Sequence, residues 1–310
     1  MSESSQAGVK RVDVACEGRA FQVWTRRMGE NPRIKILLLH GGPGSTHTMY
    51  DCFNDYFPVE GFEYYFYDQL GSFCSDQPVD DDLWTIDRFV DEVEQVRSAL
   101  GLAEGNFFLF GSSWGGMLAL EYAFKHQHHL KGLIVSSAQA SMRDYNRYAN
   151  EVLAQSMDPK DLAEIRSLEA AEDFENPKYE ELLAPFYTQF VLRMPKSEWP
   201  AAVTETMPRL NRHIYELMNG PSEFGMRGRL KDWDVKGDLH RIKVPTLVIG
   251  STYNTMDPEQ QKWMASEVQR GQYLHCPDGS HLAMWDDPEV FFSGLISFIR
   301  EVDSAERRTT

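Results

Sequence analysis

The sequence predicts an α/β fold, with a mostly parallel sheet flanked by helices and an inserted helical cap. Short apolar segments typical of buried strands alternate with helical segments in the first part of the chain and again near its end. Between these two parts the strand signals disappear, and helical segments rich in Met and aromatic residues replace them. We therefore expect a core made of residues 1–138 and 239–310, with a cap at residues 139–238.

The first part of the core opens with extended segments between residues 21 and 40. The last of these, KILLLH, is continuously apolar, as in a parallel strand that is covered on both faces. The segment IDRFVDEVEQVRSAL places its apolar residues near one helical face and its acidic residues on the other. Further strands are expected at residues 63–68, 106–111 and 130–137, and helices at residues 86–100 and 117–125.

The cap and the second part of the core follow. Residues 151–190 contain ten acidic and three basic side chains, a local net charge of −7, which predicts an acidic cap. After the cap the alternation of strands and helices resumes. Strands are expected at residues 245–250 and 272–276, and helices at residues 258–268 and 288–302.

Composition excludes several classes of function. The 310 residues carry 31 basic and 47 acidic side chains, and a net charge of −16 argues against binding to nucleic acids or anionic membranes. The four cysteines are far apart and form no C-x-x-C pair, so we expect neither a zinc site nor a disulfide framework. No apolar run has the length of a membrane span, and the N-terminus carries no apolar leader segment. The expected compartment is the cytoplasm.

The motif G-S-S-W-G lies between a predicted strand and a predicted helix. This is the setting of a nucleophile elbow, in which a serine occupies a strained turn and glycines on both sides allow close packing. Ser113 is the middle residue of the motif, so we expect Ser113, and not Ser112, to be a nucleophile.

A second motif, H-G-G-P-G at residues 40–44, follows an earlier predicted strand. Acyl transfer places negative charge on the carbonyl oxygen, and backbone N–H groups aimed at that oxygen stabilise the charge. Gly42 and Trp114, the residue after Ser113, are expected to supply the two N–H groups of this oxyanion hole.

A serine nucleophile needs a general base, and in this chain order the base comes last. Of the nine histidines, His40 is expected to be a structural part of the glycine turn, and His275 falls inside a predicted strand. His281 lies in the segment PDGSH, which we expect to be a loop after that strand. We therefore predict that His281 is the base.

The third member of a catalytic triad orients the histidine and is expected in the loop after residues 245–250. Asn254 and Asp257 both lie there, and spacing alone does not choose between them. An amide at this position carries no charge and can hold the imidazole in the wrong tautomer. Asp257 precedes Pro258 at a predicted helix start, where capping is its ordinary role.

Several motifs together resemble the proline iminopeptidases, serine aminopeptidases with an α/β-hydrolase fold. They are, in chain order, H-G-G-P-G, D-Q-L-G-S at residues 68–72, G-S-S-W-G-G, N-G-P-S-E-F at residues 219–224, K-D-W-D at residues 231–234 and G-S-H-L-A-M-W at residues 279–285. The resemblance covers about residues 12–302. It implies a helical cap over the sheet and release of an N-terminal residue, often proline, from peptides or amino-acid amides.

The resemblance also assigns roles to single residues. It implies that Glu223, in N-G-P-S-E-F, binds the free amino group of the substrate; the alternative is a helix-cap partner after Gly-Pro-Ser. Family members have aspartate at the position of Asn254, 27 residues (281 minus 254) before His281. Some carry a second acid at the position of Thr255. Asn254 is therefore expected at the triad position, with Asp257 less favoured.

The expected function is that of a serine aminopeptidase or amino-acid amidase. Its substrate is a small peptide or amide with a free N-terminus, and no cofactor or metal is implied. Two alternatives remain open: an esterase or amidase that does not select a free amine, and a binding protein whose catalysis is impaired by Asn254.

Overall fold

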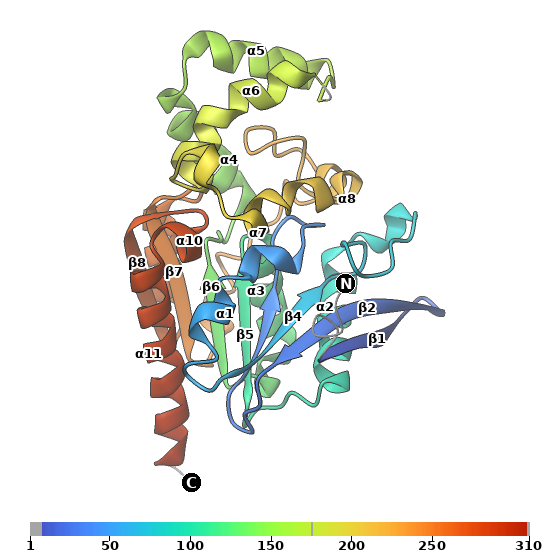
Figure 1. The fold of residues 1–310 in the computed structure, drawn as a ribbon, viewed down its shortest axis with the longest axis vertical. Helices are drawn as coiled ribbons and strands as arrows, with labels where there is room; N and C mark the ends of the chain where they lie inside the picture. Colours follow the sequence, from blue (N-terminus) through green and yellow to red (C-terminus); the bar gives the residue numbers. More distant parts are fainter. Residues whose placement is uncertain (1–7, 175, 309–310) are drawn as a thin grey trace.

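The computed structural model describes residues 8–174 and 176–308, and its framework is an eight-stranded sheet (Figure 1). The strand order is β1-β2-β4-β3-β5-β6-β7-β8. The pairs β1–β2 and β2–β4 are antiparallel, and every other neighbouring pair is parallel. The strands are β1 (Val9–Cys16), β2 (Arg19–Met28), β3 (Lys35–Leu39), β4 (Glu63–Asp68), β5 (Phe107–Ser112), β6 (Gly132–Ser136), β7 (Thr246–Tyr253) and β8 (Gly271–Ser280).

The predicted mostly parallel sheet is confirmed, and the central strands β4, β5 and β6 are buried along their whole length. Such strands are covered on both faces, which is why they are continuously apolar in the sequence. Strand β1 was not predicted. It pairs only with β2 at the edge of the sheet, and half of its residues are exposed, so its apolar signal is weak.

Helices cover both faces of the sheet and form two apolar cores. Along β3, Leu37 and Leu39 belong to the core with α2 and α3, whereas Ile36 and Leu38 belong to the core with α1 and α11. This alternation follows from the two-residue period of a strand. The helices flanking the sheet are α1 (Phe53–Tyr56), α2 (Ile86–Ala99), α3 (Trp114–His126), α9 (Pro258–Glu267), α10 (Ala283–Asp286) and α11 (Pro288–Arg307).

The segment between β6 and β7 is helical and lies beyond one end of the sheet (Figure 1). Its helices are α4 (Met142–Glu151), α5 (Pro159–Ala170), α6 (Pro177–Phe186), α7 (Ala201–Thr204) and α8 (Arg212–Met218). Helices α4, α5 and α6 contribute to a separate apolar cluster, which includes Ile165, Leu183 and Phe186, whereas α7 and α8 pack on the two cores of the sheet. On these grounds we propose the division into core residues 1–138, cap residues 139–238 and core residues 239–310.

One strand boundary differs from the prediction in a way that matters for function. Strand β8 continues to Ser280, because Ser280 pairs with Tyr253 of β7 after a register shift. His281 therefore follows the strand directly instead of lying inside a loop. The end of the strand fixes its backbone position.

The structure bears on the membrane expectation only for the residues that it describes. Within 8–174 and 176–308, no helix combines the length and apolar character needed to cross a bilayer. The start of the N-terminal segment, for which no leader was expected, lies at residues 1–7, outside the described residues. All four cysteines are free, with Cys52 and Cys276 buried and the other two partly buried.

Candidate active site

Ser113 occupies a sharp turn between β5 and α3. Its φ of 57° and ψ of −125° lie in a region that residues other than glycine rarely adopt. The Ser113 N–H donates a hydrogen bond of 3.0 Å to the Ser136 carbonyl oxygen at the end of β6. Ser112 is completely buried, whereas Ser113 is partly exposed. The turn therefore presents the hydroxyl of Ser113, and not that of Ser112, to the site.

Glycines around Ser113 allow three backbone segments to pack closely. A methyl group on Gly115 would lie 2.0 Å from the Leu39 carbonyl oxygen, so no larger residue fits between α3 and β3. A methyl group on Gly41 would lie 3.2 Å from Ser113 Cβ. The loop that begins at His40 therefore runs directly beside the elbow serine.

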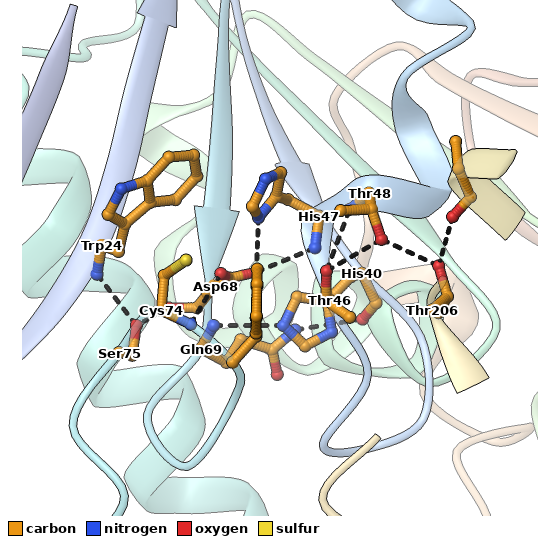
Figure 2. Close-up of polar contacts among 12 residues, drawn as sticks. Trp24, His40, Thr46, His47, Thr48, Asp68, Gln69, Cys74, Ser75 and Thr206 are labelled. Carbon is orange, nitrogen blue, oxygen red and sulfur yellow. Dashed lines mark hydrogen bonds and ion pairs between the residues drawn. The ribbon is translucent and has the colours of Figure 1, made fainter. Parts of the chain in front are cut away.

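A buried hydrogen-bond network connects this loop with the start of α3. The Gln69 N–H donates to His40 Nε2 at 3.1 Å, and Gln69 Nε2 donates to the His40 carbonyl oxygen at 3.0 Å (Figure 2). The Oε1 atom of Gln69 accepts a hydrogen bond of 2.9 Å from the Trp114 indole. Because all three residues are buried, Gln69 aligns the H-G-G-P-G loop with the residue that follows Ser113.

The network also determines the direction of the Gly42 N–H. His40 Nε2 accepts a hydrogen bond, so Nδ1 carries the proton and donates to the Gly41 carbonyl oxygen at 2.9 Å. Burial lowers the pKa of His40 and keeps the ring neutral. In a trans peptide the C=O and N–H groups point in opposite directions. The Gly42 N–H therefore points away from the His40 ring.

Gly42 follows Gly41, which lies against Ser113, and Trp114 follows Ser113 in the chain, so both are candidates to supply backbone N–H groups to the site. Trp114 is the first residue of α3, and the first N–H groups of a helix have no partner within it. The two groups come from loops that Gln69 holds together. Their role as an oxyanion hole stays a prediction.

Further polar contacts attach the H-G-G-P-G loop to its surroundings. Asp68, the last residue of β4, accepts a hydrogen bond of 2.8 Å from the His47 N–H. The hydroxyl groups of Thr46 and Thr48 lie 3.1 Å apart, and Thr48 contacts Thr206 of the cap at 2.8 Å (Figure 2). The loop is thus anchored to both the sheet and the cap.

His281 has two hydrogen-bond partners at its Nδ1 atom. Asn254 Oδ1 lies 3.1 Å from this nitrogen and Thr255 Oγ1 lies 2.9 Å from it. Burial lowers the pKa of His281 to about 4, and no charged neighbour offsets this effect. The imidazole is therefore neutral at neutral pH, as a general base has to be.

The Asn254 amide is oriented so that its oxygen faces His281. Its Oδ1 atom accepts the Met256 N–H at 3.1 Å, while its Nδ2 atom donates to Ser137 Oγ at 3.0 Å and Ser251 Oγ at 2.9 Å. An oxygen facing Nδ1 accepts the Nδ1 proton and leaves Nε2 free to act as a base. The Asn254 oxygen therefore favours the tautomer of His281 that carries its proton on Nδ1. Unlike an aspartate, Asn254 has no charge and donates two hydrogen bonds through Nδ2.

Asp257 lies away from His281. Its carboxylate caps α9 by accepting the Glu259 N–H at 3.0 Å, as its position before Pro258 predicted. Of the two alternatives for the triad position, the structure thus brings Asn254 to the histidine. Its catalytic role stays a prediction.

Ser113 and His281 are linked only indirectly. Both are described residues, yet the structure records no hydrogen bond between their side chains. Catalytic hydrogen bonds of this kind often shorten only when substrate binds. Two consecutive residues at the end of β6 connect the halves of the site, because the Ser136 carbonyl oxygen accepts from the Ser113 backbone N–H and Ser137 Oγ accepts from the Asn254 amide.

Glu223 lies in the cap segment after α8 and remains partly exposed. Its Oε1 atom accepts a hydrogen bond of 3.0 Å from the Tyr215 hydroxyl, and its Oε2 atom accepts one from the Tyr145 hydroxyl. Burial raises the pKa of Glu223, an effect that these two hydrogen bonds oppose. No helix begins in the fully described segment 219–238, so the alternative role of Glu223 as a helix-cap partner is wrong.

One group of side chains in the described ranges has the composition of a metal site. Glu94, His126 and His129 offer ligand atoms within 4.8 Å of one another, at the C-terminal end of α3. The Glu94 carboxylate already accepts hydrogen bonds from Arg97 at 2.7 Å and 2.8 Å and from Tyr122 at 2.7 Å. We therefore assign no metal to this group.

Comparisons with known proteins agree with this geometry. The chain matches the alpha/beta hydrolase fold family over residues 35–288. It is 56% identical over 284 residues to a proline iminopeptidase from Flavobacterium johnsoniae, covering 91% of this chain and 95% of that protein. The chain belongs to the proline iminopeptidase family.

Other members of the proline iminopeptidase family are also similar. The enzyme from Elizabethkingia meningoseptica is 54% identical over 287 residues, covering 92% of this chain and 95% of the relative. The solved structure of the proline iminopeptidase from Mycobacterium smegmatis has a TM-score of 0.83 and 28% identity, with 96% of this chain and 100% of that chain covered. The expected family and α/β-hydrolase fold are confirmed, and the chain is a hydrolase of the serine aminopeptidase type.

Sequence reasoning missed several residues of this proline iminopeptidase site. Tyr145 and Tyr215 lie in ordinary helical segments, and Ser137 follows a strand without any motif around it. The sequence drew attention to Thr255 only because some family members carry an acid at this position. No local pattern marks these residues, because their partners Glu223, Asn254 and His281 lie in other segments of the chain.

Proposed function

We propose that this enzyme releases the N-terminal residue, proline or another apolar amino acid, from peptides or amino-acid amides. Ser113 attacks the carbonyl carbon, His281 takes the proton and returns it to the leaving amine, and the Gly42 and Trp114 N–H groups stabilise the oxyanion. Asn254 holds the tautomer of His281. Each of these steps uses the chain's own residues.

The observation that supports selection of a free amine is the environment of Glu223. Its carboxylate is held by two tyrosine hydroxyls, and no Lys, Arg or His side chain pairs with it among residues 8–174 and 176–308. Glu223 is mostly but not fully buried, and a carboxylate in such surroundings without a cation is destabilised. A substrate ammonium group would supply the missing charge in a charge-assisted hydrogen bond.

The test compares two substrates in one variant. Glu223→Gln should lower kcat/KM for prolyl 4-nitroanilide by about 10- to 150-fold, the loss of one charge-assisted contact. The loss for an ester without an amine should be much smaller. Equal losses on both substrates would favour an esterase or amidase without amine selectivity.

The cap offers a matched control. Glu169 is also a buried carboxylate, and it accepts hydrogen bonds from Tyr179 at 2.9 Å and from Ser222, the residue before Glu223. Glu169→Gln should change the melting temperature but not the ratio of amide to ester turnover. A change in that ratio would show that cap stability, and not amine binding, sets the selectivity.

We also propose a cytoplasmic location, which four free cysteines support, since disulfides are rare in that compartment. The net charge of −16 supports small peptides as partners in place of nucleic acids or anionic membranes.

A further inference from the structure

The carboxylate of Glu223 is held by two tyrosines that come from different helices. Tyr145 of α4 donates a hydrogen bond to Oε2, and Tyr215 of α8 donates one of 3.0 Å to Oε1. Each tyrosine uses its single hydroxyl hydrogen in this contact. A carboxylate has about four acceptor positions, so each oxygen of Glu223 keeps a further position for a ligand.

Both helices start close to the catalytic loops. The residue that caps the start of α8 is Asn211, whose backbone N–H donates to the Gly44 carbonyl oxygen of the H-G-G-P-G loop at 2.8 Å. Its Nδ2 atom donates to the Gly71 carbonyl oxygen, also at 2.8 Å. Helix α4 is the first helix after β6, and Figure 1 shows α4 and α8 between the sheet and the helices α5 and α6. The two tyrosines therefore fix Glu223 relative to the loops around Ser113.

We propose that Tyr145 and Tyr215 are specificity-determining positioning residues, which keep Glu223 ionised and oriented to receive the free amine of the substrate. Hydrogen bonds donated to a carboxylate favour its charged form. Without these donors, burial would favour the protonated acid, which forms no ion pair with an ammonium group. The inference rests on the proposed function and names the residues on which its amine selectivity depends.

The groups that face Glu223 agree with this role. Burial raises the pKa of Glu223, and the hydrogen bonds from Tyr145 and Tyr215 oppose that effect. In the part of the chain that the structure describes, no charged side chain acts on this pKa. Burial and the charge of Glu223 raise the pKa of both tyrosines, and also that of Tyr187 in the turn after α6. All three phenols therefore stay neutral, and Tyr145 and Tyr215 keep the hydrogens that they donate.

The cap contains a second pair of the same kind, which provides a matched control. Tyr179 donates a hydrogen bond of 2.9 Å to Glu169 Oε1, and both residues are buried. Tyr179→Phe removes the same type of hydrogen bond from a carboxylate that has no part in the proposed site. This variant therefore measures how far a loss of cap stability alone affects turnover.

The first test compares prolyl 4-nitroanilide with p-nitrophenyl acetate, an ester without an amine. Tyr145→Phe and Tyr215→Phe should each lower kcat/KM for the nitroanilide by about tenfold, the loss of one hydrogen bond to a charged group. The loss should arise mainly from a higher KM, because the amine is bound before and during the reaction. The ester should lose much less, and Tyr179→Phe should leave the ratio of the two substrates unchanged. Equal losses on both substrates, or no loss in either tyrosine variant, would overturn the inference.

The pH profile gives a readout that a loss of packing would not move. The ionised form of Glu223 binds the amine, so activity on prolyl 4-nitroanilide falls as pH decreases through the pKa of Glu223. Removing a tyrosine donor raises that pKa, and the acid limb should move to higher pH in Tyr145→Phe and Tyr215→Phe. The limb should stay in place in Tyr179→Phe. An acid limb that is unmoved in both tyrosine variants would overturn the inference.

Glu223→Gln separates this inference from the proposed function. If Glu223→Gln selectively lowers activity on the nitroanilide but neither tyrosine variant does, Glu223 binds the amine without the tyrosines, and the inference alone fails. If Glu223→Gln lowers activity on both substrates equally, the proposed amine selectivity is wrong, and the inference falls with it.

A double-mutant cycle shows whether the tyrosines act through Glu223. Tyr145→Phe should have little further effect on the ratio of the two substrates in the Glu223→Gln protein. Full additivity would overturn the inference, because Tyr145 would then act through another group. If Tyr145→Phe does not fold, the cycle with Tyr215→Phe answers the same question.

Discussion

The two halves of the active site are built differently. The half around Ser113 comes from loops after the neighbouring strands β3, β4 and β5, and buried hydrogen bonds through Gln69 hold these loops together. The half around His281 follows β7 and β8 and also depends on the cap. The backbone N–H of His281 donates to the Phe190 carbonyl oxygen at 2.9 Å, and the backbone N–H of Leu282 donates to the Val191 carbonyl oxygen at 3.0 Å.

This difference suggests different sensitivities to substitution. In the Ser113 half, buried hydrogen bonds between the neutral residues His40, Gln69 and Trp114 hold the loops beside the elbow in place. In the His281 half, the proposed base contacts only uncharged groups at its Nδ1 atom, the Asn254 amide and the Thr255 hydroxyl. We therefore expect changes in the first half to act on stability or to abolish catalysis, and changes in the second half to tune the rate.

The largest effect is expected from Ser113→Ala. The variant should lose turnover apart from the catalysis that oxyanion hole and binding alone provide, about 10³- to 10⁴-fold over water. Steady-state kinetics and labelling with a fluorophosphonate measure this loss. Ser112→Ala is the control. If Ser113→Ala keeps its activity and Ser112→Ala loses it, Ser112 and not Ser113 is the nucleophile.

Asn254→Asp tests whether a negative charge beside His281 increases the rate of catalysis. Because the tautomer is already correct, the carboxylate should raise kcat by about 10- to 100-fold, as for one hydrogen bond to a charged group. The same variant should be less stable by about 1 kcal/mol, since Ser251 donates to the Ser280 carbonyl oxygen at 2.6 Å and has no hydrogen for the new carboxylate.

Kinetics and thermal unfolding of Asn254→Asp measure both effects. An unchanged kcat would show that the neutral amide of Asn254 supports His281 as well as a carboxylate does.

The pH profile should show the lowered pKa of His281. The neutral imidazole is the active form, so kcat/KM should stay level as pH falls and drop only through about 4. A carboxylate at position 254 favours the imidazolium, so in Asn254→Asp this acid limb should move to higher pH. The profile is measured with an ester lacking an amine, because Glu223 also titrates on the acid side. An acid limb with its midpoint near pH 6.5, the ordinary pKa of histidine, would show that burial does not lower the pKa of His281.

Gln69→Leu tests the rigidity of the Ser113 half. The substitution leaves the Trp114 indole N–H and the His40 carbonyl oxygen without their buried partner, which should cost about 2 kcal/mol of stability. Chemical denaturation measures this loss, and Gln77→Leu at an exposed position is the control. If Gln69→Leu is as stable as the parent protein but has a reduced kcat, Gln69 contributes to catalysis and not to the stability of the fold.

The smallest effect is expected from Asp257→Asn. Asparagine also caps helices, so the cost should be at most about 1 kcal/mol of stability, with kcat unchanged. Thermal unfolding and steady-state kinetics measure both. Loss of kcat in this variant would reassign the triad position from Asn254 to Asp257.

Sequence alone was sufficient wherever function depends on neighbours along the chain. Apart from the edge strand β1, the main strands and helices follow from local patterns. The Ser113 elbow and the H-G-G-P-G turn do so too, because a sharp turn and a close approach of backbones require particular residues at fixed spacing. The buried strands were recognisable for the same reason, since burial on both faces demands continuous apolar segments.

The tertiary structure decided what the polar groups of the site do. The Asn254 amide is oriented by Met256 and by Ser137, which lies 117 residues away, and no pattern near Asn254 reveals that choice. Likewise, Tyr145 and Glu223 lie 78 residues apart in the sequence and meet only in the folded cap. A hydrogen bond depends on where its donor and acceptor lie in space. Sequence therefore determined which residues could react, and folding determined which atom of each one faces its partner.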